Sequence, residues 1–193
     1  MFPGRAQPAE AARPDFIPAG AGRAQWKCMA ARLAPVLLLL VRVAFCEVLP
    51  QSFQARVVSV ADGDTLTVLQ NRQQIRIRLY GIDCPEKGQP FHTRASRRTA
   101  ELAQGRTVTV RTESRDRYGR LVAWVILPDG RSLNETLVAE GMAWHFRRYA
   151  PRERRLMQLE QEARDARRGL WQDPAPVPPW EWRRHSRLSA GRQ

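Results

Sequence analysis

Hydrophobic and polar residues alternate through the middle of the chain in a pattern that predicts short β-strands. In the segment 74–82, QIRIRLYGI, apolar residues at alternate positions share one face, and Arg76, Arg78 and Tyr80 share the other, as expected of a half-buried strand. Apolar stretches of similar length predict four more strands, at 53–60, 64–70, 106–112 and 120–127. Gly63 precedes one of them, and the sequence NRQQ joins that strand to 74–82, as turn residues between paired strands do.

Three further segments have the spacing of helices, namely 92–104, 132–141 and 151–171. The last is the clearest, with Pro151 near its start, Leu156 and Leu159 on one face, and Gly169 near its end. Five strands, with helices after the third and the fifth, predict an α+β fold in which helices pack on a small antiparallel barrel. Periodicity does not fix the order of the strands, so an OB-fold barrel is one candidate among several.

The two ends of the chain differ from this predicted domain. Residues 1–28 are rich in Ala, Pro, Gly and Arg without periodicity, and we expect a non-native or disordered extension. Residues 29–46 combine a short basic start with an apolar run, the layout of a secretory signal peptide; an uncleaved N-terminal anchor or a buried helix is the alternative. The domain at 50–172 is therefore expected to be exported, to the periplasm or the medium. The Pro- and Arg-rich residues 173–193 are expected to form a flexible tail.

Composition favours an anionic partner and leaves no disulfide within the domain. The 193 residues carry a formal net charge of +13 and a pI of about 11.2, a balance typical of proteins that contact nucleic acid or membrane surfaces. Nearly all of the 32 basic residues are arginines, a skew that genome composition alone also produces, so the charge supports such a partner only weakly. Of the three cysteines only Cys84 lies in the predicted domain, and no Cys or His spacing indicates a metal site.

Isolated acidic residues stand at the ends of predicted strands, where the rim of a barrel would bring them together. Asp64 lies in DGDT at the start of one strand, and Asp83 follows the next strand in YGIDCPE, with Glu86 three residues further on. Carboxylates of this kind bind hard cations such as Ca²⁺ or Mg²⁺. Arg78 and Arg120 add two guanidiniums at predicted strands, and a planar guanidinium suits the oxygens of a phosphate.

Together these side chains supply what phosphodiester hydrolysis requires. A cation and two arginines neutralise the charge that develops on the phosphate, and a remaining carboxylate activates water. Each motif alone is ordinary, because DGDT is more often a β-turn than a metal site and surface arginines are commonly solvated. Their combination gains weight because the motifs that contain these residues resemble those of a known family.

The order and spacing of three motifs resemble the staphylococcal nuclease, or thermonuclease, family. The motifs are DGDTLTV, RLYGIDCPE and DRYGRLVAWV, and the resemblance covers roughly residues 52–172. It implies a five-stranded OB-fold barrel with three helices. It also implies an enzyme that cleaves DNA and RNA, as an endonuclease and an exonuclease, and leaves 3′-phosphates.

The resemblance also implies a role for individual residues of these motifs. Asp64, Asp83 and the backbone carbonyl of Cys84 would bind Ca²⁺, with Mg²⁺ or another divalent cation as an alternative. Glu86 would contact the cation through water and act as general base on the attacking water. Two arginines would stabilise the transition state, Arg78 and Arg120. The residues beside the bound nucleotide would be Asp116, Arg117, Tyr118 and Tyr149.

Two positions depart from the family pattern. Cys84 stands where the family has threonine, and a thiol beside the site is open to oxidation. Arg147 stands at one of two positions where the family has nucleotide-stacking tyrosines, while Tyr149 matches the other. We interpret the neighbouring Trp144 and Phe146 as aromatic core residues rather than as base contacts.

Three classes of function fit the sequence. The first is an exported, cation-dependent nuclease that acts as a monomer on DNA and RNA without a protein partner. The second is a binding module of the same fold without catalysis, which the presence of all the expected catalytic and metal-binding residues argues against. The third is an envelope protein whose leader or tail does the main work, with membrane contact only if the leader stays uncleaved. We expect the first.

Overall fold

The computed structural model describes residues 51–190, and the side chains as far as residue 188. The expected extension at 1–28 and the expected leader at 29–46 lie outside the described residues, so both stay predictions. Among residues 51–190, no helix combines the length and the apolar composition that crossing a bilayer requires.

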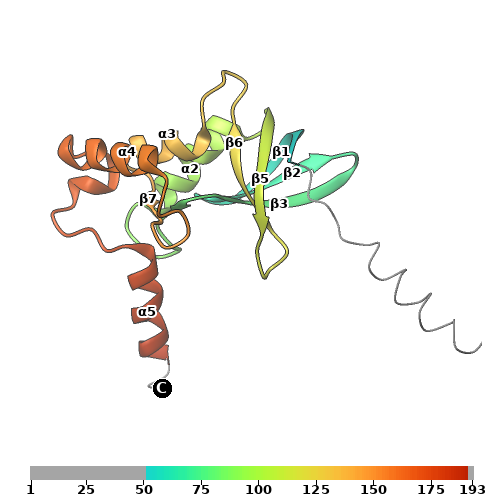
Figure 1. Cartoon of the computed structure of the whole chain (residues 1–193). Coiled ribbons are helices and arrows are strands. Elements are labelled where there is room, and N and C mark those ends of the chain that lie inside the picture. The colour runs from blue at the N-terminus through green and yellow to red at the C-terminus, as the bar shows by residue number, and fades with distance from the viewer. Residues whose placement is uncertain (1–50, 191–193) are drawn as a thin grey trace, which may run out of the picture. The chain divides into compact units, whose positions relative to one another are not determined.

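Five strands close into a barrel in the order β1–β2–β3–β6–β5 (Figure 1). Their bounds are β1 Ser52–Asp62, β2 Thr65–Gln70, β3 Gln73–Leu79, β5 Thr107–Arg115 and β6 Leu121–Ile126. Neighbouring strands are antiparallel except β3 and β6, which are parallel. The barrel is therefore mixed, and the prediction of an antiparallel barrel was wrong in this respect. Alternation along a strand shows which face each residue occupies, but it does not show whether the neighbouring strand runs parallel or antiparallel. A closed five-stranded barrel of this kind agrees with the predicted OB fold.

The predicted strand 74–82 is divided in two by a turn. β3 ends at Leu79, and Gly81 adopts a positive φ of 74°. The two-residue strand β4 (Ile82–Asp83) then pairs with β7 (Trp144–His145) instead of continuing along the barrel. A Cβ at Gly81 would lie 2.7 Å from Cδ1 of Leu156, so glycine permits both the backbone turn and the close packing of a helix against it.

Four α-helices and one 3₁₀ helix accompany the barrel in the described part of the chain. They are α2 (His92–Ala103), α3 (Leu133–Ala139), α4 (Arg154–Asp165), η1 (Gly169–Gln172) and α5 (Pro179–Ala190). The first three α-helices lie within the predicted helical segments. The predicted helix 151–171 is shortened, because Arg167 and Gly169 take positive φ values after α4.

The additional helix is α5, which lies where a flexible tail was expected. Three helices were predicted, and α5 is the reason why the structure has one more. In Figure 1, α2, α3 and α4 lie together on one side of the barrel, and α5, drawn in red, extends away from them.

Alternating residues of the barrel strands form the hydrophobic core. Fully buried side chains from these strands include Val57, Leu66, Val68, Ile77, Val110 and Val125. Leu137 of α3 and Leu156 of α4 are equally buried against them. Because this packing fixes which residues face inward, it also fixes the register of the strands. The core thereby positions the polar residues at the strand ends.

Candidate active site

One arginine of β3 joins the two predicted metal-binding aspartates. Arg78 pairs with Asp64 through Nη1, and its Nη2 lies 2.6 Å from Oδ1 of Asp83. The register of β2 and β3 places Arg78 opposite Thr65, the residue that follows Asp64. Both aspartates are buried, so the guanidinium neutralises carboxylates that water hardly reaches.

The turn before β2 holds Asp64 in place. Its Oδ2 accepts a hydrogen bond of 2.7 Å from the backbone N–H of Cys84, and its Oδ1 accepts one of 3.1 Å from the Thr65 hydroxyl. Gly63 permits this approach, because a Cβ there would lie 2.8 Å from Cβ of Cys84. The Thr99 hydroxyl of α2 donates to the Gly63 carbonyl at 2.6 Å. The turn, α2 and the loop after β4 therefore form one packed unit.

Glu86 lies in the loop between β4 and α2. Its backbone N–H donates to Oε1 of Gln89 at 2.9 Å, and Oε1 of Glu86 pairs with Nη1 of Arg183. The Glu86 side chain is 33% exposed. A carboxylate with this exposure is open to solvent, as a group that takes a proton from water has to be.

Arg183 of α5 is the member of the site that no prediction included. Its Nη2 lies 2.7 Å from Oδ2 of Asp83, its Nη1 lies 3.4 Å from Oδ1, and Nη1 also pairs with Glu86. Partial burial lowers the pKa of Arg183, but the hydrogen bonds to Asp83 and Glu86 outweigh it and raise the pKa above its usual value. The sequence signal was the pair of tryptophans in PWEWRR, since such large apolar rings are usually packed against a domain.

Arg120 approaches the same place from the residue before β6. Its Nε donates to Oδ2 of Asp116 at 2.7 Å, and its Nη1 lies 3.5 Å from the Thr65 hydroxyl. Asp116 also accepts hydrogen bonds from the backbone N–H groups of Tyr118 and Arg120. Burial raises the pKa of Asp116, but these hydrogen bonds lower it below its usual value. The carboxylate that orients Arg120 is therefore ionised at neutral pH.

Arg117 and Tyr118 lie at the exposed tip of the turn between β5 and β6. Nη2 of Arg117 donates to the Tyr118 hydroxyl at 2.7 Å, and its guanidinium carbon lies 4.8 Å from the centre of the ring. The guanidinium carbon of Arg120 lies 5.5 Å from the same ring centre, and Tyr118 is 69% exposed. Three of the four predicted nucleotide-binding residues are thus gathered around Arg120.

The fourth, Tyr149, belongs to a separate aromatic group. Its ring packs edge-on against Phe146, with centroids 4.9 Å apart, and the residue is largely exposed. Trp144 is buried in a second apolar cluster, as expected of a core residue, whereas Phe146 is half-buried. Arg147 lies 3.2 Å from a carboxylate oxygen of Glu160, so its charge is paired within the fold.

Cys84, which departs from the family pattern, is buried with Sγ beside Gly63. Burial raises the pKa of the Cys84 thiol well above its usual value. A buried, protonated thiol reacts slowly, so the structure protects this residue from the oxidation that its place in the sequence suggested.

The oxygen atoms of Asp64, Asp83 and Glu86 fit a hard divalent cation by their chemistry. Within residues 51–190, no three or more His, Cys, Asp or Glu side chains are arranged as a ready cation site. Guanidiniums hold these carboxylates instead, Arg78 on both aspartates and Arg183 on Asp83 and Glu86. A cation that binds to these carboxylates therefore has to displace at least one of the guanidiniums of Arg78 and Arg183.

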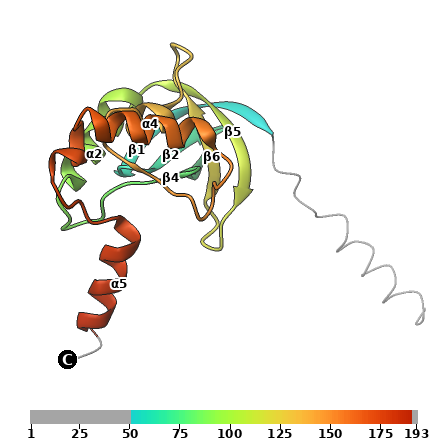
Figure 2. The same ribbon diagram turned by 60° about the vertical axis from the view of Figure 1, so that its left-hand side comes forward.

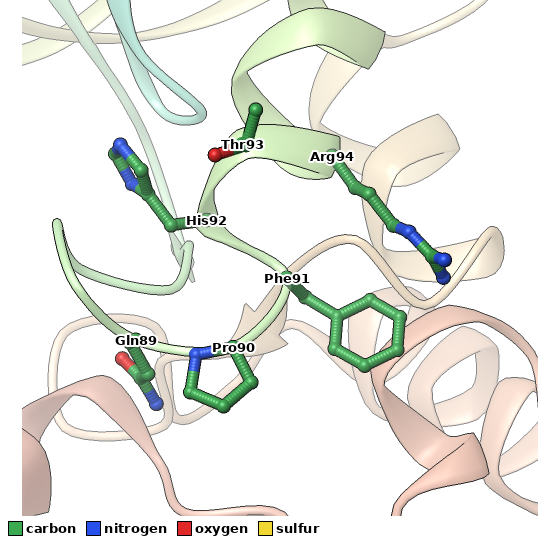
Figure 3. A pocket seen from close by; sticks show the side chains of 6 residues that line it. All are labelled: Gln89, Pro90, Phe91, His92, Thr93 and Arg94. Carbon is green, nitrogen blue, oxygen red and sulfur yellow. The ribbon is translucent and has the colours of Figure 1, made fainter.

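A pocket opens at the start of α2, beside the Glu86 loop (Figure 3). It is lined by Gln89, Pro90, Phe91, His92, Thr93 and Arg94. Phe91 precedes α2 in the left-handed conformation, with a φ of 67°, and the guanidinium carbon of Arg94 lies 5.0 Å from its ring centre. Nδ1 of His92 lies 3.0 Å from the carbonyl oxygen of Pro85. The residues predicted for catalysis and metal binding lie outside this lining.

Comparisons with known proteins agree with the resemblance, and the family-model match includes the second and third of the sequence motifs. The family model described as Staphylococcal nuclease homologue matches residues 76–173. An uncharacterized endonuclease from Escherichia coli O157:H7 is 45% identical over 136 residues, which cover 70% of this chain and 88% of the relative. A micrococcal nuclease from Shigella flexneri is 44% identical over 144 residues, covering 70% of this chain and 83% of the relative. Protein ParB from Escherichia coli is 38% identical over 173 residues, covering 85% and 95%.

Proposed function

This chain belongs to the staphylococcal nuclease family and is a hydrolytic nuclease; on this premise, we propose that it uses a divalent cation, Ca²⁺ in the first place, to cleave DNA and RNA to 3′-phosphate products. The observation that carries the proposal is the convergence of Asp64 and Asp83 on the single guanidinium of Arg78. Two buried carboxylates held this close provide oxygen ligands for a doubly charged cation.

The proposed cation ligands are Asp64, Asp83 and the backbone carbonyl of Cys84, with Glu86 in contact through water. When bound, the cation neutralises charge on the phosphate oxygens and polarises the phosphoryl group. Strand register and the tight Gly63 turn support this assignment, because they fix Asp64 without the help of a ligand. Mg²⁺ or another divalent cation that prefers oxygen is the alternative.

Glu86 is the proposed general base. Its carboxylate takes a proton from a water molecule, whose oxygen attacks the phosphorus while the bond to the 5′ oxygen of the next nucleotide breaks. The departing 5′ oxygen takes up a proton from solvent water, Glu86 later returns its proton to solvent, and the phosphate stays on the 3′ oxygen. The partial exposure of Glu86 supports this role, and so does the hydrogen bond from its backbone to Gln89, which steadies the loop.

Arg78 and Arg120 are the proposed transition-state residues. Both approach the segment Asp64–Thr65, since Arg78 pairs with Asp64 and Arg120 lies near the Thr65 hydroxyl. Each planar guanidinium can engage two phosphate oxygens at once, and fixed donors stabilise developing negative charge best in a site that excludes water. Asp116 orients Arg120, and the nucleotide is contacted by Arg117, Tyr118 and Tyr149.

The test is cleavage of single-stranded DNA and RNA by the purified protein with Ca²⁺, and then with excess chelator. Cleavage should stop with the chelator and resume when the cation is restored, and mass spectrometry should find 3′-phosphate ends. An Asp83→Asn variant purified in the same way controls for contaminating nucleases. Binding of DNA without cleavage under any divalent cation would contradict the proposal and favour a binding module.

Export is a separate part of the proposal and rests on the composition of residues 29–46. The nuclease then acts in the periplasm or outside the cell, with a membrane anchor formed by an uncleaved leader as the alternative. Fractionation of cells and sequencing of the mature N-terminus tests this part. A full-length protein in the cytoplasmic fraction would contradict both export and the membrane anchor.

A further inference from the structure

Helix α5 reaches the candidate active site through Arg183, a residue of its N-terminal half. Arg183 contacts Asp83 and Glu86, whereas Arg184 and Arg187 further along the helix are exposed. Figure 2 shows α5 extending away from α2 and α4. The helix also lies beyond residue 173, where the match to the family ends. A segment outside the matched region therefore contacts the carboxylates of the nuclease site.

We propose that α5 is an internal inhibitor of the nuclease, in which the Arg183 guanidinium occupies the carboxylate oxygens that the divalent cation uses. The cation and α5 then compete for one place, and docking of α5 lowers the apparent affinity for the cation. This inference rests on the proposed function, because it takes Asp83 and Glu86 to serve the cation.

The contacts of Asp83 show why the two occupants exclude each other. Its Oδ1 accepts from Arg78 at 2.6 Å and lies 3.4 Å from Arg183, and its Oδ2 accepts from Arg183 at 2.7 Å. Glu86 pairs with the same guanidinium through Oε1. A divalent cation bound to these oxygens would lie against Arg183, and like charges in a partly buried site repel strongly. Because strand register fixes Arg78 opposite Thr65, Arg183 is the guanidinium that has to leave when the cation binds.

Several contacts that hold α5 in place lie around its start. The Trp180 ring stacks on Phe146, with centroids 5.3 Å apart and planes inclined by 4°, and meets Trp144 edge-on at 5.8 Å. Nε2 of Gln89 donates to the carbonyl of Val177 at 2.5 Å. The barrel core is built without α5, so this helix can leave the site while the barrel stays folded.

Gln89 also connects α5 with the loop of the proposed general base. Its Oε1 accepts the hydrogen bond from the Glu86 backbone, while its Nε2 donates to Val177. Departure of α5 therefore removes a hydrogen bond at this loop together with the Arg183 ion pairs. The same movement frees both the cation oxygens and the side chain that is proposed to activate water.

The affinity for Ca²⁺ tests the competition directly in the full chain. Arg183→Gln removes the competing charge, and Arg184→Gln makes the same change at an exposed neighbour in the helix. Isothermal titration should show Ca²⁺ binding about tenfold tighter for Arg183→Gln than for the wild type, if α5 is docked in about nine molecules of ten. Arg184→Gln should bind as the wild type does. Unchanged or weaker binding by Arg183→Gln would overturn the inference.

The position of α5 gives a readout that does not depend on activity. Hydrogen–deuterium exchange in α5, followed by mass spectrometry, reports how often the helix leaves its docked position. Addition of Ca²⁺ should increase exchange in α5 of the wild type and change it little in Arg183→Gln, where no charge at position 183 competes with the cation. Slower exchange of wild-type α5 with Ca²⁺, or no change, would overturn the inference.

Failure of this inference differs from failure of the proposed function. If the inference alone fails, the wild type cleaves DNA with Ca²⁺, and Arg183→Gln binds Ca²⁺ no more tightly. If Arg183 instead binds the phosphate of the substrate, Arg183→Gln loses cleavage while its affinity for Ca²⁺ is unchanged. That result also overturns the inference that α5 is an inhibitor. If the proposed function fails, neither protein binds Ca²⁺ or cleaves DNA, and the inference falls with it.

Discussion

Two arginines hold the same aspartate from two parts of the molecule that are built in different ways. Arg78 belongs to β3, lies opposite Thr65 in the strand register, and has a side chain that is 17% exposed. Arg183 belongs to α5, lies 100 residues from Asp83 in the sequence, and has a side chain that is 32% exposed. The first is positioned by the barrel, and the second by contacts around the first turn of one helix.

The difference shows which parts of the site are permanent. A residue positioned by strand register moves only if the barrel opens, whereas a residue on a peripheral helix moves whenever that helix does. Arg78 lies inside the family-matched residues and Arg183 lies outside them. In our account the barrel carries the nuclease chemistry, and α5 controls access of the cation to it.

Replacement of Arg120 by alanine tests the barrel side of this comparison. Arg120 is positioned at a barrel strand, as Arg78 is, and is oriented by Asp116. Loss of this donor should lower kcat for single-stranded DNA by about 10²–10³-fold, as expected when a transition-state contact is removed. Arg111→Ala, which changes an exposed arginine of β5, should keep the wild-type rate. Full activity of Arg120→Ala would refute its role.

Replacement of Leu66 by alanine tests whether the barrel and the site fail together. Leu66 is fully buried in β2, two residues after Asp64. The cavity should lower the free energy of unfolding by about 2–5 kcal/mol, measured by urea denaturation with circular dichroism. Cleavage and Ca²⁺ binding should disappear over the same range of urea as the fold. Loss of both well before the barrel unfolds would show that the strand register does not position the site.

Replacement of Trp180 by alanine tests the α5 side and should have a smaller effect of opposite sign. An aromatic pair such as Trp180 and Phe146 contributes roughly 0.5–1.5 kcal/mol beyond its buried area, so cleavage at low Ca²⁺ should become about two- to tenfold faster. Initial rates at subsaturating Ca²⁺ measure this, with Trp182→Ala on the same helix as the matched control. A slower Trp180→Ala enzyme with an intact barrel would contradict the role of α5.

The smallest expected effect concerns the pH dependence of stability at the barrel side. Burial raises the pKa of Asp116, but hydrogen bonds from Arg120 and Tyr118 lower it below the usual carboxyl value. Ionised Asp116 therefore stabilises the fold above that usual value, and the contribution is lost as the pH falls through the lower, folded-state pKa. Asp116→Asn should cost up to about 1 kcal/mol at neutral pH.

Thermal unfolding at a series of pH values measures this contribution. The difference in stability between the wild type and Asp116→Asn should shrink below about pH 4 and vanish at lower pH. A difference that stays constant down to acid pH would mean that Asp116 acts through packing and not through its charge.

The fold was predictable from sequence where burial is regular. Alternation indicated β3 and apolar stretches indicated the other four barrel strands, and β2 and β5 begin within one residue of their predicted starts. The turn at Gly81 was not predicted, because YGI continues the apolar pattern and the turn depends on packing against Leu156. The parallel pairing of β3 with β6 was also not predicted, because the alternation of apolar and polar residues does not identify which strand lies beside which.

The site was predictable where its residues lie in local motifs. Asp64, Arg78 and Asp83 were expected to meet at the barrel rim, and the structure brings them into contact. Arg183 was not predictable in the same way, because the preceding DPAPVPP indicates a linker. Its pairing with Asp83 depends on tertiary contacts of Trp180, for which the sequence has no periodic pattern.

In the proposed cation-dependent hydrolysis, Glu86 takes the proton of the attacking water. The most direct measurement is the single-turnover rate of single-stranded DNA cleavage by Glu86→Gln and by the wild type at saturating Ca²⁺. Glu113→Gln, the same change at an exposed residue of β5, is the matched control. We expect a rate about 10²–10⁴-fold lower for Glu86→Gln, with the fold retained, and the wild-type rate for the control. A Glu86→Gln protein as fast as the wild type would contradict the claim.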